Sequence, residues 1–247
     1  MLTAFNYYEP EEESRIQKEM KMTSFFAREL KVAESFARNH SSGGDARKRC
    51  AVCGSSKVSY FYEKWGVKYL RCMDCYSVMA DVKEEDIQEY IQLKELNEIR
   101  LSEEYQKNGT ESRQQKWEEL LDWLRYRTYG YCGRNTGFSI LDYGTRWEGL
   151  RQFLQKSDLC KTYELRDSIL HDSRQEAIRE NHVDLILALD YIQQKRKPVQ
   201  FFREAYNNLK KGGLLILGTK VGSGFDILSL RQNNRNVFPY EHILMPS

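Results

Sequence analysis

Four cysteines in two close pairs are the residues of this chain whose spacing points most directly to chemistry. Cys50 and Cys53 form one C-x-x-C pair, Cys72 and Cys75 form a second, and 18 residues lie between the pairs. Four thiolates at this spacing suit a tetrahedral Zn²⁺ site, which leaves no coordination position open for water. The pattern therefore predicts a structural zinc ion. The alternatives are a redox-active dithiol and cysteines that are unrelated to one another.

A series of acids at the ends of apolar runs forms a second group. One run ends at Asp142 and is followed by Gly144, the pattern of a buried strand that leads into a tight turn. Glu164 ends a second run 22 residues after Asp142, near the spacing at which an acid usually meets ribose hydroxyls. Asp190 ends a third run, and Asp172 lies between the second and third. The alternatives are an ordinary strand-to-helix turn at Asp142 and a solvated loop carboxylate at Asp172.

These segments resemble class I methyltransferases that use S-adenosylmethionine (SAM). The match consists of motif I at 139–144 (SILDYG), a fourth strand at 183–190 (VDLILALD), and a helix, glycine turn and strand at 202–217 (FREAYNNLKKGGLLIL). The resemblance covers roughly 139–228 and implies an α/β fold with a Rossmann-like sheet. It also implies SAM as cofactor, held by five residues: Asp142, Gly144, Glu164, Asp172 and Asp190.

The order of the two modules implies a class of acceptor. A zinc ribbon ahead of such a domain is similar to methyltransferases that act on sugars in surface-polysaccharide or antibiotic pathways. A small, sugar-like or nucleotide-sugar acceptor is therefore implied by the resemblance.

The C-terminal segment carries the predicted catalytic pair. Residues 238–242 (FPYEH) resemble a Pro-x-Glu-His stretch of some sugar methyltransferases. The resemblance implies that His242 is the general base that removes a proton from the acceptor and that Glu241 orients it. An unperturbed imidazole pKa of about 6.5 suits that task. The alternative is a surface histidine in a loop.

Departures from the family pattern support other functions. Arg146 and Glu148 stand where later glycines of motif I are expected, and only 18 residues separate Glu164 from Val183. The chain stops soon after the last predicted strand, which fits an incomplete C-terminal part of the sheet. A second hypothesis is therefore a catalytically inactive methyltransferase-like protein with a binding or assembly role. A third is a zinc-ribbon protein that binds nucleic acid.

The elements that must position these residues follow from apolar periodicity and turn signals. A hairpin is expected at 58–62 and 67–70 around the turn Trp65-Gly66, and parallel strands at 140–143, 162–165, 183–189 and 214–219. A helix should begin at Pro198 and be ended by Gly212-Gly213. Helical segments are expected at 11–39 and 84–126, the second interrupted at Asn108-Gly109. We expect four domains: a helical segment at 1–48, the ribbon at 49–82, a helical connector at 83–132 and the Rossmann-like domain at 133–247.

Charge and hydropathy limit the partners. The chain has 38 basic and 36 acidic residues, so its formal charge is only +2. Nucleic acid is therefore not expected as a partner. No apolar run is long enough to cross a membrane and the start does not resemble a signal peptide, so the cytoplasm is the expected compartment. An exposed final strand should be covered by the N-terminal helices, a second copy or another protein.

Overall fold

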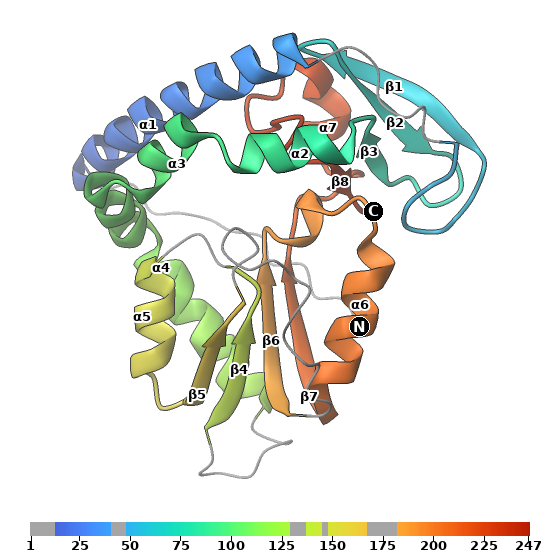
Figure 1. The fold of residues 1–247 in the computed structure, drawn as a ribbon. Coiled ribbons are helices and arrows are strands. Elements are labelled where there is room, and N and C mark those ends of the chain that lie inside the picture. Colours follow the sequence, from blue (N-terminus) through green and yellow to red (C-terminus); the bar gives the residue numbers. More distant parts are fainter. Residues whose placement is uncertain (1–12, 41–47, 129–136, 145–147, 167–181) are drawn as a thin grey trace.

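The computed structural model describes residues 13–40, 48–128, 137–144, 148–166 and 182–247, a mixed α/β fold with two four-stranded sheets. The parallel sheet has the strand order β5-β4-β6-β7, and the other sheet has the order β1-β2-β3-β8. Figure 1 shows the parallel sheet in the lower half of the molecule. Three helices cross the top beside the second sheet: α1 (Glu13–Asn39), α2 (Glu84–Ile91) and α3 (Lys94–Leu101).

The second sheet is antiparallel and carries the cysteines. It consists of β1 (Val58–Lys64), β2 (Val67–Cys72), β3 (Val78–Ala80) and β8 (Leu244–Met245). Trp65 and Gly66 connect β1 to β2 with φ angles of 52° and 84°. Two positive φ angles in a two-residue loop define a type I′ turn, whose twist matches the flanking strands. The predicted hairpin is thus confirmed, and we call residues 48–82 the cysteine ribbon.

The last strand of this sheet comes from the far end of the chain. Met79 of β3 lies opposite Leu244 of β8, and both are buried with Cys50 and Cys72 in one small cluster. The sequence-based expectation placed the whole of 133–247 with the parallel sheet. In the structure, the segment after β7, which includes α7 (Phe225–Leu230), instead returns to the cysteine ribbon.

The parallel sheet contains the strands that were expected, with small shifts of boundary. They are β4 (Phe138–Asp142), β5 (Cys160–Leu165), β6 (Val183–Leu189) and β7 (Leu209–Gly218). After β4 the chain passes through α5 (Glu148–Lys156) to β5, and after β6 it passes through α6 (Pro198–Asn208) to β7 on the other side. The direction of winding therefore switches between β4 and β6.

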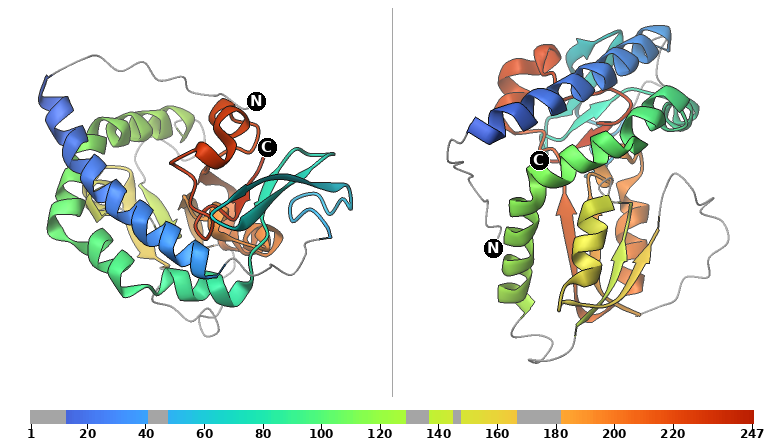
Figure 2. Two further views of the ribbon diagram at one scale, coloured as in Figure 1. Left: turned by 90° about the horizontal axis from the view of Figure 1, so that it is seen from above. Right: turned by 90° about the vertical axis from the view of Figure 1, so that its left-hand side faces the viewer.

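Helices cover both faces of the parallel sheet. Ile140, Leu185 and Leu187 pack with residues of α4 (Glu103–Thr128) and α5, whereas Leu141 and Ile186 pack with residues of α6. The alternation of strand side chains between faces explains this division. In Figure 2, α4 runs from the upper helices down along the sheet and so belongs to both halves of the fold.

Two predictions of where a helix ends or is interrupted were wrong. The helix at Pro198 ends at Asn208, where the side-chain amide donates to the Glu204 carbonyl (2.8 Å), and Gly212-Gly213 lie inside β7. The helix α4 continues through Asn108-Gly109. The Asn108 amide donates to the Glu104 carbonyl (2.9 Å) within the helix instead of favouring a turn.

The largest buried cluster joins segments that are remote in the sequence. It combines apolar side chains of α1, α2 and α3, the cysteine ribbon and the C-terminal segment, among them Phe36, Tyr90, Tyr69 and Tyr240. Rings of Phe36 and Tyr240 meet edge to face with centroids 4.9 Å apart. In the described residues β7 pairs with one strand only, β6, so its other side is a sheet edge.

Candidate functional site

The four cysteine sulfurs converge on one point and could hold a metal ion. All four Sγ atoms lie within 4.8 Å of one another, and the pairs Cys50–Cys75 and Cys53–Cys72 are each 3.6 Å apart. Metal–sulfur bonds of about 2.3 Å in a tetrahedron require sulfur–sulfur distances of about 3.8 Å. The observed spacing fits that geometry. We call these four residues the cysteine site.

Two turns of the same design position the cysteines. The Cys50 amide donates to the Ser55 carbonyl (2.8 Å) and the Gly54 amide donates to the Cys50 carbonyl (3.0 Å). In the second turn, the Cys72 amide donates to Ser77 (3.0 Å) and the Tyr76 amide to Cys72 (3.0 Å). Gly54 and Tyr76 occupy equivalent positions and both have positive φ, 75° and 59°. The second turn therefore places a tyrosine where the first has glycine.

The thiols of the cysteine site have different proton affinities. Burial raises the pKa of Cys50 to about 12. Burial would also raise the pKa of Cys75, but hydrogen bonds with the side chain and backbone of Ser77 lower it to about 7. A metal ion entering the site must therefore displace at least the Cys50 proton at neutral pH.

The cysteine site is connected to the carboxyl ends of the parallel strands, which we call the carboxyl edge. Ile243, next to β8, accepts a hydrogen bond from Ala80 (2.8 Å) and donates one to the Gln193 carbonyl (2.7 Å). Gln193 lies in η1 (Ile192–Gln194), directly after β6. Ile243 thus contacts both β3, the strand beside the cysteines, and the segment directly after β6, where the winding of the parallel sheet changes direction.

At the carboxyl edge, Asp142 is buried and its carboxylate accepts a hydrogen bond from the Tyr163 hydroxyl of β5. Burial and the Asp142 charge raise the pKa of that hydroxyl. Gly144 follows two residues later with φ of 72°, a conformation that favours glycine. A turn with a left-handed glycine directly after the first parallel strand lets another group approach the backbone closely.

The other predicted cofactor residues are spread around this edge. The Glu164 carboxylate is partly exposed, forms an ion pair with Arg166 (3.8 Å) and lies 3.7 Å from Nε2 of His182. Leu141, not Asp142, is the register partner of Glu164, so the two carboxylates belong to opposite faces of the sheet. Asp190 is exposed, has φ of 59° and donates its amide to the Gly218 carbonyl (2.7 Å). Asp172 lies outside the described residues.

The predicted catalytic pair lies in the buried segment ahead of β8. His242 is 4% exposed, and its Nδ1 accepts the Phe238 amide hydrogen at 2.8 Å. A neutral imidazole with an accepting Nδ1 carries its proton on Nε2, so in this arrangement Nε2 is a donor. Glu241 is also 4% exposed, and its carboxylate contacts the Arg100 guanidinium at 2.6 Å.

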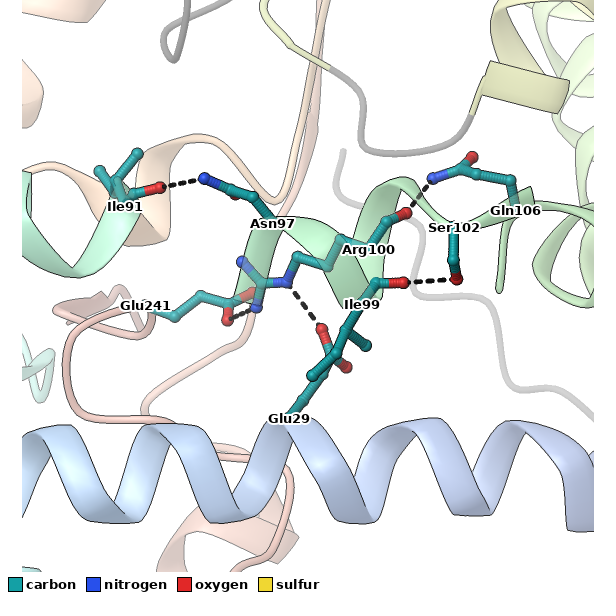
Figure 3. Close-up of polar contacts among 8 residues, drawn as sticks. All are labelled: Glu29, Ile91, Asn97, Ile99, Arg100, Ser102, Gln106 and Glu241. Atoms are coloured by element: carbon teal, nitrogen blue, oxygen red, sulfur yellow. Dashed lines mark hydrogen bonds and ion pairs between the residues drawn. The ribbon is translucent and has the colours of Figure 1, made fainter. Parts of the chain in front are cut away.

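The ion pair of Glu241 belongs to a buried triad that local sequence patterns do not reveal. Arg100 of α3 contacts Glu241 through Nη2 and Glu29 of α1 through Nε at 2.7 Å (Figure 3). The Arg100 side chain is 15% exposed and the two carboxylates are 5% exposed or less. Burial alone would lower the pKa of Arg100, but Tyr90 and Glu29 outweigh burial and raise it. The triad ties three remote segments together.

Comparisons with protein-family models, with curated proteins and with solved structures each found no match. Within the described ranges, no helix has both the length and the apolar character required to cross a membrane. The geometry of the cysteine site and the carboxyl edge is therefore the basis for any assignment.

Proposed function

We propose that this protein binds SAM at the carboxyl edge and transfers its methyl group to a small, sugar-like acceptor, with structural zinc in the cysteine site. One observation carries the proposal: the winding of the parallel sheet switches between β4 and β6, and the turn after β4 contains Gly144 in a left-handed conformation. In open parallel sheets, ligands bind at such a switch, outside the carboxyl ends of the strands. A Rossmann-like sheet would place the cofactor there.

Chemically, the reaction would be an in-line displacement. A nucleophilic atom of the acceptor would attack the methyl carbon of the sulfonium, the carbon–sulfur bond would break, and the acceptor proton would pass to a base. Glu164 would accept hydrogen bonds from the ribose, since its carboxylate is partly exposed. His242 is the proposed base. This role requires its Nδ1, the one accepting nitrogen of the neutral ring, to give up the hydrogen bond from the Phe238 amide and accept the proton of the acceptor.

The first test is calorimetric titration of the zinc-loaded protein with SAM and with S-adenosylhomocysteine. Saturable binding that Glu164→Gln weakens supports the proposal, because a neutral amide is a poorer acceptor for two hydroxyl groups. Glu63→Gln, an exposed glutamate on β1, is the matched control and should leave binding unchanged. No binding of either compound by folded protein would overturn the proposal.

A second candidate function is an assembly role without turnover. The observation that favours it is that two predicted functional carboxylates already have protein partners, Tyr163 for Asp142 and Arg100 for Glu241. An assembly protein would bind SAM without consuming it, or would not bind it. Release of S-adenosylhomocysteine in the presence of a sugar nucleotide would exclude this function.

A further inference from the structure

A cluster of aromatic rings and arginines lies on the cysteine ribbon and the adjoining C-terminal segment. The Arg71 guanidinium carbon is 5.4 Å from the centroid of the Phe61 ring and 5.1 Å from that of Tyr76. The guanidinium carbon of Arg231 is also 5.4 Å from the Phe61 centroid. These distances lie in the range of cation–π contacts. Two guanidinium groups thus share one aromatic ring, and we call these four residues the arginine cluster.

Among the described residues, neither guanidinium of the arginine cluster is neutralised by a carboxylate. Within the described part of the chain, no ion pair includes Arg71 or Arg231, whereas the buried Arg100 and the exposed Arg38 both have carboxylate partners. The Arg71 Nε is buried without a hydrogen-bond acceptor among the described residues. The cluster therefore presents positive charge that lacks a carboxylate partner among these residues and that an anionic ligand would complement.

Backbone strain is concentrated in the same cluster. The described residues include four non-glycine residues with positive φ, and two of them are Tyr76 (59°) and Arg231 (46°). Tyr76 takes this conformation at the turn position where the other cysteine turn has Gly54. A non-glycine residue in such a conformation is strained, and retained strain of this kind is typical of functional positions.

We propose that the arginine cluster is a binding site for single-stranded nucleic acid. Arginine donates paired hydrogen bonds to phosphate, and guanidinium planes and aromatic rings stack on bases. Tyr76 is 50% exposed and the neighbouring Met73 is 52% exposed, so apolar surface is available beside the charges. The net charge of +2 describes the whole chain, whereas the arginine cluster brings to one ring two arginines that have no ion pair within the described part of the chain. This site is independent of the proposed SAM site.

The test measures binding of fluorescently labelled oligouridine and oligothymidine of about 12 nucleotides to the full-length, zinc-loaded protein. Arg71→Gln and Arg231→Gln should each weaken binding by about fivefold or more and each reduce the slope of log affinity against log salt by about 0.7. Arg203→Gln, which removes the same charge from an exposed position of α6, should leave both quantities unchanged.

Tyr76→Gly separates a binding role from a structural one. The change relieves the left-handed conformation, so the midpoint of denaturation should rise, yet it removes a stacking ring, so oligonucleotide affinity should fall. Metal content is measured for every variant, because Tyr76 is next to Cys75. The proposal is overturned if the oligonucleotides do not bind, if Arg203→Gln has the same effect as the cluster variants, or if polyglutamate competes as well as oligouridine does.

Discussion

Arg100 and Glu241 form a buried ion pair of 2.6 Å although they are 141 positions apart in the chain. The second contact of Arg100, with Glu29, completes a triad that joins α1, α3 and the segment ahead of β8. A charge removed from water in this way needs its partners, because the loss of one leaves an uncompensated charge in the interior. The triad therefore makes the position of His242, the next residue after Glu241, dependent on the N-terminal helices.

Replacing Arg100 by methionine should lower the free energy of unfolding by about 3–5 kcal/mol, since two buried carboxylates would lose their cation. Urea denaturation followed by tryptophan fluorescence measures the change. Arg38→Met is the matched control: its ion pair with Glu34 has a similar length, 2.7 Å, but the arginine side chain is 63% exposed. The control should change stability by less than about 1 kcal/mol. Equal losses in the two variants would show that burial does not determine the contribution of the triad.

Metal removal should release the C-terminal strand. Met79 and Leu244 pair across β3 and β8 and pack on Cys50 and Cys72, so loss of the metal ion should loosen the contact that holds β8. Hydrogen exchange of a peptide covering 241–247 should accelerate after chelation or in Cys72→Ser. A peptide covering β6 (Val183–Leu189) is an internal reference, because it lies in the other sheet.

The control for the metal experiment is Cys160→Ser, which changes a cysteine outside the cysteine site. This variant should retain the metal ion and the protection of 241–247. Unchanged exchange of 241–247 in metal-free protein would contradict the connection between the cysteine site and β8.

A pH-dependent contribution to stability should come from Lys64. This side chain is 4% exposed and donates a hydrogen bond to the Asn234 carbonyl. Burial lowers its pKa to about 8, while the charge of Glu34 opposes the shift. Between about pH 8 and the ordinary lysine pKa, the unfolded chain binds one more proton than the folded protein at this residue. The contribution of Lys64 to the free energy of unfolding should therefore rise with pH across that window.

The measurement is the difference in unfolding free energy between the wild type and Lys64→Met at several pH values from 7 to about 10. Other titrating groups cancel in the difference. A positive slope is the expected result. Lys68→Met, at an exposed position of β2, should give a flat difference. A flat difference for Lys64→Met as well would mean that the Lys64 amine is not desolvated.

Local patterns in the sequence predicted the elements that short-range physics determines. Two C-x-x-C pairs predicted the cysteine site, and the Trp65-Gly66 turn and the run 183–189 predicted a hairpin and a parallel strand. The pairing of β8 with β3 was missed because a two-residue strand has no periodicity of its own. The Glu29–Arg100–Glu241 triad was missed for a related reason, since a charged residue in a helix normally faces solvent and its burial depends on segments far away in the chain.

Close packing of α5 on α4 gives a final prediction, at Gly149. In the sequence this glycine follows Glu148, one of the departures from motif I. A Cβ atom added to Gly149 would lie 2.2 Å from Oγ1 and 2.5 Å from Cγ2 of Thr110 in α4. Gly149→Ala should therefore destabilise the protein by about 1–3 kcal/mol, despite the better helix propensity of alanine. Thermal and urea denaturation measure the loss. In the Thr110→Gly background the clashing side chain is absent. Adding Gly149→Ala to that background should therefore cost less stability than adding it to the wild type. If alanine at 149 stabilises the protein, the two helices are not in contact at this point.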